Sequence, residues 1–137
     1  MSSKDWYEIL EHEFAADDGS FLFQLHCDFV WDRKAFTRLT EAMYSCCQTY
    51  DKNRLQPPLP GMERAYDLTL LPRWLTDGFW YCATCIEGHT SHPAWQSKIA
   101  TDPVYYEKAY ERLRDLAQWF FSGECGYLNP AKQFAAM

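Results

Sequence analysis

Residues 102–123, DPVYYEKAYERLRDLAQWFFSG, carry the clearest structural signal in this sequence. Asp102 is a typical residue before the first turn of a helix, and Pro103 suits the first helical position, where an amide hydrogen is not needed. Apolar residues then recur every three or four positions, and Gly123 is a typical helix terminator. The inward-facing set is Tyr106, Ala109, Tyr110, Leu113, Leu116, Ala117 and Phe120. The stretch predicts one long amphipathic helix.

Two segments nearer the start of the chain show the same periodicity. Residues 32–50 begin at Asp32, a capping residue, and repeat apolar side chains at intervals of three and four. Residues 4–15 follow two serines that can cap a helix, and their polar residues lie opposite one apolar face. That face consists of Trp6, Ile9, Leu10 and Phe14. Both segments are predicted to be helices.

A further helix is predicted over residues 72–88, because Pro72 fits a first turn and apolar residues follow at helical spacing. The dipeptide His92-Pro93 is expected in the loop after it. Proline cannot continue a helix, so the PPLP sequence at 57–60 predicts a stiff connector after residue 51. A short helical stretch is expected over residues 62–70.

Residues 21–31 are ambiguous. Phe21, Phe23, Leu25 and later odd-numbered residues alternate as in a β-strand. The same segment also places apolar residues on one helical face after Ser20, and no second strong strand is available to pair with it. We therefore favour a helix here and keep a strand as the alternative.

These elements predict an all-α fold, an irregular bundle of about four to five helices in a single domain over residues 1–137. Residues 124–137 are expected to form a loosely held tail. No stretch approaches the roughly 20 apolar residues that cross a bilayer, and the start of the chain lacks a signal sequence. We expect a soluble, cytoplasmic protein with reduced cysteines and no membrane partner.

The charge is unevenly distributed. Residues 1–32 hold eight acidic residues and one basic residue, a net charge of −7, while the whole chain has a net charge of −6. The rest of the molecule is thus close to neutral. An acidic segment of this kind favours a basic partner, and the scattered lysines and arginines argue against direct binding of nucleic acid.

The sharpest motif is the C-x-x-C pair of Cys82 and Cys85, followed by His89 and His92. Thiol redox sites and zinc sites use such residues. However, a helix would place Cys82 away from free amides, and one straight helix cannot bring all four side chains to one ion. We therefore interpret both cysteines as small buried apolar residues, and predict no metal and no cofactor.

No signature of a common enzyme class is present. His12, Glu13, His26 and Asp28 could serve as acid–base groups, but no spacing forces any two of them together. The PPLP sequence could bind an aromatic-grooved domain, but we interpret so short a match as a rigid loop. The sequence therefore predicts a protein without enzymatic activity.

The hypothesis that follows is a protein-binding inhibitor of the immunity or antitoxin type, which neutralises a basic toxin or a nucleic-acid-acting enzyme. Exposed aromatic residues would anchor the complex. The predicted partner-binding residues are Glu8, Glu11, Asp17, Asp18, Asp28 and Asp32. Two alternatives stay open: a metal-binding or thiol-active module centred on Cys82, Cys85, His89 and His92, and a structural subunit of a homodimer or a larger assembly.

Overall fold

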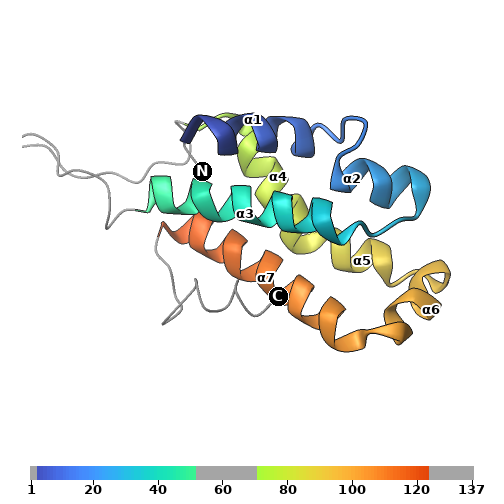
Figure 1. The fold of residues 1–137 in the computed structure, drawn as a ribbon. Helices are drawn as coiled ribbons and strands as arrows, with labels where there is room; N and C mark the ends of the chain where they lie inside the picture. Colours follow the sequence, from blue (N-terminus) through green and yellow to red (C-terminus); the bar gives the residue numbers. More distant parts are fainter. Residues whose placement is uncertain (1–2, 52–70, 124–137) are drawn as a thin grey trace, which may run out of the picture.

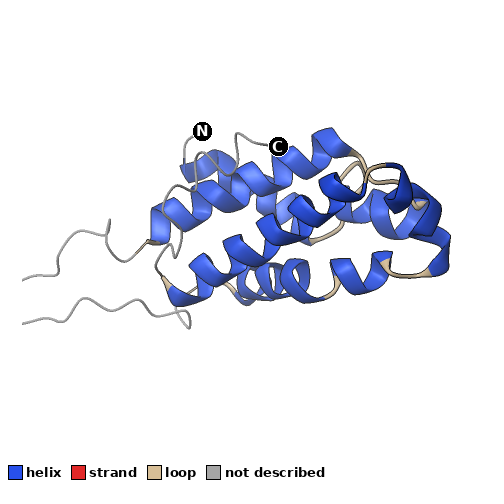
Figure 2. Cartoon of the chain, turned by 90° about the horizontal axis from the view of Figure 1, so that it is seen from below, coloured by secondary structure: helices blue, strands red, loops and turns tan. Residues whose placement is uncertain are grey.

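A computed structural model describes residues 3–51 and 71–123, and it confirms the all-α prediction (Figures 1 and 2). Within these ranges the chain forms seven α-helices, one π-helical segment and no strand. They are α1 (Ser3–Phe14), α2 (Phe21–Phe23), η1 (Gln24–Asp28), α3 (Arg33–Tyr50), α4 (Arg73–Thr84), α5 (Ile86–Thr90), α6 (Pro93–Thr101) and α7 (Pro103–Ser122). The predictions for residues 57–60, 62–70 and 124–137 lie outside the described residues.

Helices α1, α3, α4 and α7 form a four-helix bundle. Helix α1 packs on α3, α3 on α7, α7 on α4, and α4 on α1, so the four helices close a ring. Helices α1 and α7 therefore lie diagonally across the bundle. The short elements gather at one end of it, where α2 and η1 join α1 to α3 and where α5 and α6 join α4 to α7 (Figure 1).

The centre of the bundle is filled by large apolar side chains, and the rings of Phe79 in α4 and Phe120 in α7 stack with their centroids 4.0 Å apart. Burying one such side chain contributes about 1.5–3 kcal/mol to folding. The largest fully buried side chains are Leu10, Phe21, Leu25, Phe36, Leu39, Met43, Leu75, Phe79, Ile86, Trp95, Leu113 and Phe120. Among the described helices, none is long and apolar enough to cross a membrane.

The predicted caps of α3 and α7 are confirmed. The Asp32 carboxylate accepts hydrogen bonds from the amides of Lys34 and Ala35, at 2.9 and 3.1 Å. The Asp102 carboxylate accepts one from the amide of Tyr105, at 3.3 Å. Gly123 ends α7 with a φ of 77°, a conformation that glycine adopts readily.

The prediction of one helix over residues 72–88 is wrong, because the chain forms two helices, α4 and α5, which meet at Cys85. The Thr84 hydroxyl donates a hydrogen bond to the Trp80 carbonyl just before the break, at 2.8 Å. Such contacts bend helices. The prediction that His92-Pro93 lies in a loop is wrong for Pro93, because a helix that was not predicted, α6, begins there. His92 caps α6 by accepting the amide hydrogen of Ala94 on its Nδ1 atom, and Pro93 opens its first turn.

The helical interpretation of residues 21–31 is confirmed over residues 21–28, where the structure has α2 followed by the π-helical segment η1. Ser20 caps α2 by accepting the amide hydrogen of Phe23, at 3.0 Å. Segment η1 ends at Asp28 and is followed by Phe29, which has a left-handed backbone with a φ of 54°. Its amide donates to the carbonyl of Gln24, which closes the wider π turn. This turn sets the position of His26.

Candidate binding site

A pocket of about 610 Å³ opens between the C-terminal end of α1, the α2–η1 segment and residues 74–81 of α4. This size lies in the range of pockets that bind small molecules or inserted side chains, about 300–1,000 Å³. The described residues that line it are Phe14, Ala16, Leu22, His26, Trp74, Asp77, Gly78, Trp80 and Tyr81. We call it the aromatic pocket.

The close approach of α1 and α4 at this pocket depends on a glycine. The ring of Phe14 lies directly over Gly78, and a Cβ atom added to Gly78 would be only 2.2 Å from the nearest ring carbon. No other residue type fits there without displacement of the ring. Gly78 therefore allows α1 to pack closely on α4 and places Phe14 in the pocket wall.

Two tryptophans of α4 shape the wall in different ways. The Trp74 ring is held by edge contacts from Tyr7 and Phe14, with centroid distances of 5.3 and 6.3 Å. Trp80 is 56% exposed, the most exposed tryptophan in the described residues. An aromatic ring left in water at a pocket is typical of a binding surface.

The polar side of the pocket is a contact between His26 of η1 and Tyr81 of α4. The Tyr81 hydroxyl and the Nε2 atom of His26 are in hydrogen-bond contact, and the His89 ring lies 4.5 Å from the His26 ring. Burial and the neighbouring His89 lower the pKa of His26 below its usual value. Burial, with smaller effects from Cys85 and Cys82, raises the pKa of Tyr81 to about 12. A protonated Tyr81 therefore donates to a neutral His26.

Asp77 supplies the negative charge of the aromatic pocket, since the other described residues that line it are apolar, aromatic or uncharged. Its carboxylate lies 3.4 Å from the Nε atom of Arg73, one turn earlier in α4. Both side chains are strongly exposed, Arg73 to 91% and Asp77 to 66%. An ion pair in this environment contributes about 0–1 kcal/mol and exchanges easily with other partners.

A second pocket, of about 490 Å³, lies along the other side of α1. Its lining includes Asp5, Glu8, Ile9, His12, Gly19 and Arg38. Asp17 is tied to this region by a contact of 3.6 Å between its carboxylate and the Nδ1 atom of His12. We call it the acidic groove.

The structure brings some of the predicted partner-binding acids together and places others elsewhere. Glu8 lines the acidic groove. Glu11 on α1 and Asp18 in the turn after α1 are exposed, and each is adjacent in sequence to a residue that lines the groove. Asp28, by contrast, is the exposed last residue of η1. Asp32 is half-buried and its carboxylate caps α3, so part of its hydrogen-bonding capacity is used within the fold.

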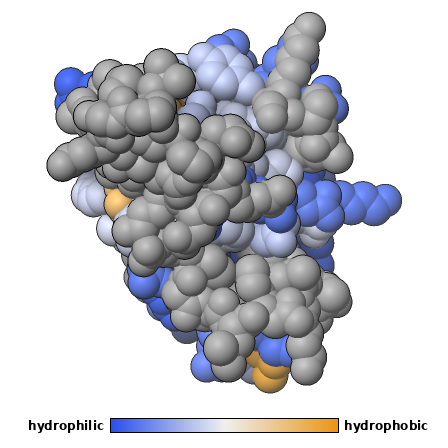
Figure 3. All heavy atoms as spheres, turned by 90° about the vertical axis from the view of Figure 1, so that its left-hand side faces the viewer, coloured by the Kyte–Doolittle hydropathy of each residue, from blue (hydrophilic) through white to orange (hydrophobic). Residues whose placement is uncertain are grey.

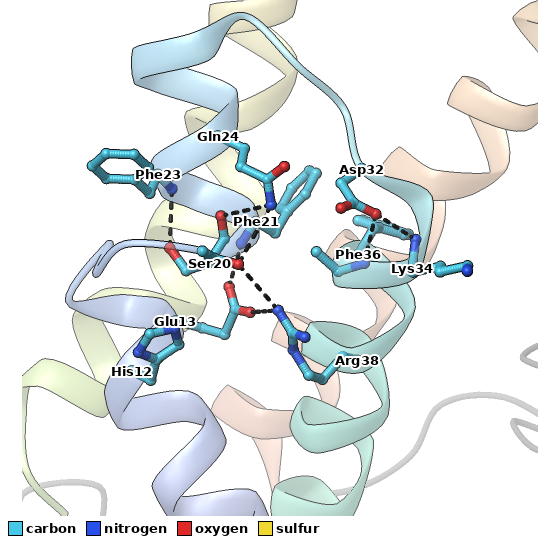
Figure 4. Close-up of polar contacts among 12 residues, drawn as sticks. His12, Glu13, Ser20, Phe21, Phe23, Gln24, Asp32, Lys34, Phe36 and Arg38 are labelled. Carbon is cyan, nitrogen blue, oxygen red and sulfur yellow. Dashed lines mark hydrogen bonds and ion pairs between the residues drawn. The ribbon is translucent and has the colours of Figure 1, made fainter.

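Glu13 belongs to the acidic segment but lies inside the protein (Figure 4). Its side chain is fully buried, accepts the Phe21 amide hydrogen at 2.8 Å and forms an ion pair with Arg38 at 3.1 Å. Arg38 also donates to the Gly19 carbonyl, at 3.3 Å. Burial is the largest effect on Glu13 and raises its pKa above the usual value. Glu13 thus fixes the turn between α1 and α2 and is not part of the acidic surface.

The acid–base candidates do not meet. His12 contacts Asp17, while Glu13 accepts a hydrogen bond from Phe21 and pairs with Arg38. His26 contacts Tyr81 and His89 instead of an acid. The contact that sequence reasoning missed is the one between His26 and Tyr81, which depends on how η1 packs against α4.

The C-x-x-C segment is divided between elements. Cys82 is buried in α4, where burial raises the pKa of its thiol, and Cys85 is half-buried at the junction with α5. His89 lies in α5 and His92 caps α6. In the described part of the chain, no group of three or more His, Cys, Asp or Glu side chains is arranged to hold a metal ion.

Comparisons with known proteins give no family. No protein-family model matches the chain, and no curated protein and no solved structure is significantly similar to it.

Proposed function

We propose that this protein is a non-enzymatic inhibitor of the immunity or antitoxin type, which binds a basic toxin or nucleic-acid-acting enzyme. One observation supports it most. The turn between α1 and α2 carries the exposed Asp17 and Asp18, and it separates the aromatic pocket, lined by Ala16, from the acidic groove, lined by Gly19. Negative charge and an accessible aromatic anchor are thus adjacent on one part of the surface.

The two features have complementary roles in binding. Exposed acids such as Glu8, Glu11 and Asp18 attract a positively charged surface and raise the association rate. A tryptophan such as Trp80 supplies apolar contact area once the partner is in place, which slows dissociation. Figure 3 shows the other end of the bundle, away from α2, α5 and α6, where the coloured surface is mainly hydrophilic, with hydrophobic residues only in isolated spots.

Under this proposal the acidic surface covers the basic substrate groove of the partner, so the partner can no longer bind nucleic acid. The interaction takes place in the cytoplasm. The free thiols of Cys46 and Cys82 support this location, because the cytosol keeps cysteines reduced.

The test uses two charge-reversal variants with the same net charge. Glu11→Lys/Asp18→Lys changes two exposed acids beside the acidic groove, and neither side chain has a hydrogen bond or ion pair with another described residue. Glu107→Lys/Glu111→Lys changes two exposed acids on α7, diagonally across the bundle. A partner is first captured from cell extract and purified, and its affinity is then measured from about 50 to 300 mM salt.

The first variant should lower the partner's affinity by roughly tenfold or more and reduce the salt dependence, because the lost charges guide association. The α7 variant should change the affinity by less than about threefold, since exposed charges that lie away from an interface contribute little to binding. Equal effects of the two variants, or a captured partner without a basic surface, would contradict the proposal.

A further inference from the structure

We propose that the aromatic pocket receives an arginine side chain of the basic partner, with its guanidinium group against the tryptophan rings and paired with the Asp77 carboxylate. This inference rests on the proposed function for the identity of the partner. The preference of the pocket for arginine, however, can be measured without that partner.

The walls of the pocket suit a planar cation. Trp74, Trp80 and Tyr81 come from consecutive turns of α4, and Phe14 closes the pocket from α1. A guanidinium group is attracted to the face of an aromatic ring within about 6 Å and stacks on it, most favourably on tryptophan. Trp80 is 56% exposed, so its ring is accessible to an incoming side chain.

The wall is also fixed before any ligand arrives. Trp74 is held by the rings of Tyr7 and Phe14, and Phe14 is held against Gly78. A preformed pocket loses little conformational freedom on binding, which strengthens the interaction with a flexible side chain.

The charge of the pocket selects a cation over an anion. Asp77 is the charged residue in its described lining, and Arg73 already directs its guanidinium group toward that carboxylate from outside. Because the Arg73–Asp77 pair is so exposed, a second guanidinium group can share the Asp77 carboxylate with Arg73 or replace Arg73 there, at a small cost in free energy. The Arg73 contact shows that the Asp77 carboxylate can be approached by a guanidinium group.

The polar side of the pocket does not oppose a cation. His26 is uncharged at neutral pH because burial and His89 lower its pKa, and it accepts the hydrogen bond of Tyr81. An imidazolium ion here would repel guanidinium, whereas the neutral His26–Tyr81 pair does not. The residues on this wall therefore add no charge that opposes a cation beside Asp77.

The pocket's volume of about 610 Å³ exceeds what one side chain needs, so it also admits the peptide backbone on either side of the arginine. We therefore expect recognition of an arginine within an exposed loop of the partner, rather than of a free small molecule.

The experiment uses protein in which all six tryptophans are replaced by 5-fluorotryptophan. Fluorine NMR then follows a resonance from each of them. Trp74→Phe and Trp80→Phe assign the two resonances of the pocket. The protein is titrated with N-acetyl-Gly-Arg-Gly-amide and with matched tripeptides that carry lysine, norleucine or phenylalanine at the centre.

We expect the arginine peptide to shift the Trp74 and Trp80 resonances to saturation, with a dissociation constant on the order of 1 mM, as is usual for a single side chain. The lysine peptide should bind more weakly, because ammonium cannot stack or form two parallel hydrogen bonds. The norleucine and phenylalanine peptides should bind at least roughly tenfold more weakly. Binding of either apolar peptide as tightly as the arginine peptide would overturn the proposal, as would the absence of any shift.

Variants of exposed residues test the two contacts separately. Asp77→Asn should weaken binding of the arginine peptide by about five- to tenfold, because a charge-assisted hydrogen bond is lost. Trp80→Ala should have an effect of similar size. Glu107→Gln and Phe121→Ala remove an exposed charge and an exposed ring of α7, and should leave binding unchanged. Unaltered binding to Asp77→Asn protein would overturn the proposal.

These outcomes are separable from those of the proposed function. If Glu11→Lys/Asp18→Lys weakens the binding of a basic partner while Asp77→Asn and Trp80→Ala leave that binding unchanged, the inhibitor role stands and the arginine site is wrong. If the arginine peptide binds as expected but no basic partner exists, the pocket preference is confirmed and the inhibitor role is wrong.

Discussion

The carboxylate of Glu13 shows how strongly a single residue's role depends on its neighbours. In the sequence it is one acid among eight in residues 1–32, and nothing local distinguishes it from Glu11. In the fold it accepts the Phe21 amide hydrogen, which would otherwise be a buried donor without an acceptor at the start of α2. The contact joins residues eight positions apart across a turn, so helical periodicity could not predict it.

Glu13 should give the protein a pH dependence opposite to the usual one for a carboxylate, and replacement of Glu13 by glutamine should remove it. Because burial raises the pKa of Glu13 above 4.5, the folded state binds its proton more tightly than the unfolded chain does. The wild-type protein should therefore lose stability relative to Glu13→Gln as the pH rises from 4.5 through the folded-state pKa. Urea unfolding of both proteins between pH 4 and 7 measures this difference. A relative gain of stability would mean that the ion pair with Arg38 outweighs burial.

His26 should show the opposite sign. Its pKa is lowered below 6.5 in the folded state, so its stabilising contribution is complete above pH 6.5 and is lost as the pH falls through the folded-state pKa. Protonation removes the acceptor for the Tyr81 hydroxyl and places a charge beside His89. Proton NMR of the imidazole should report a pKa below 6.5. His26→Gln should flatten this part of the stability profile, and an unchanged profile would contradict the assignment.

At the scale of single elements, local signals predicted helices where α1, α3, α4 and α7 lie, but missed the break between α4 and α5 and the separate helix α6. Asp32, Asp102 and Gly123 mark the ends of α3 and α7, and each acts as expected. Helix α6 was not predicted because histidine is not a usual cap, although Pro93 at its first position was a signal that could have indicated it. The alternation of residues 21–31 did not mark a buried face, because Cys27 and Phe29 are exposed while Leu22 is buried.

The contact between α1 and α4 predicts opposite effects for two glycine substitutions. Gly78→Ala improves helix propensity by about 1 kcal/mol, but its Cβ would displace the Phe14 ring, and overpacking costs about 1–3 kcal/mol or more. Gly88→Ala in α5 meets no atom within 4 Å, so it should stabilise the protein by about 0.5–1 kcal/mol. Urea unfolding measures both. Stabilisation by Gly78→Ala would show that the ring can move without cost.

At the scale of the whole molecule, the sequence predicted the fold class and the uneven charge, but not the pockets. The aromatic pocket combines Phe14 and Ala16 with residues 74–81, and only the packing of α1 on α4 brings these segments together. The inhibitor hypothesis requires an exposed aromatic residue as an anchor, and Trp80 is such a residue. Which rings share a pocket could not be predicted, because this depends on contacts between distant segments.

Concentrated negative charge should reduce the stability of the free protein. Glu8 and Glu11 lie one turn apart on α1, so their charges repel each other. Glu11→Lys/Asp18→Lys should raise the free energy of unfolding by about 0.5 kcal/mol at low salt, with a smaller gain at about 0.5 M salt. The Glu107→Lys/Glu111→Lys variant controls for the change in net charge. A larger gain for the control would mean that repulsion is not concentrated in the N-terminal segment.

The contact between Phe14 and Gly78 also has an evolutionary consequence. The two positions share one fixed volume, so they should covary across related sequences. Where position 14 is aromatic, position 78 should be glycine, and a larger residue at 78 should accompany a smaller one at 14. A relative that has made this exchange would fill the space differently and would therefore bind a differently shaped group in its pocket.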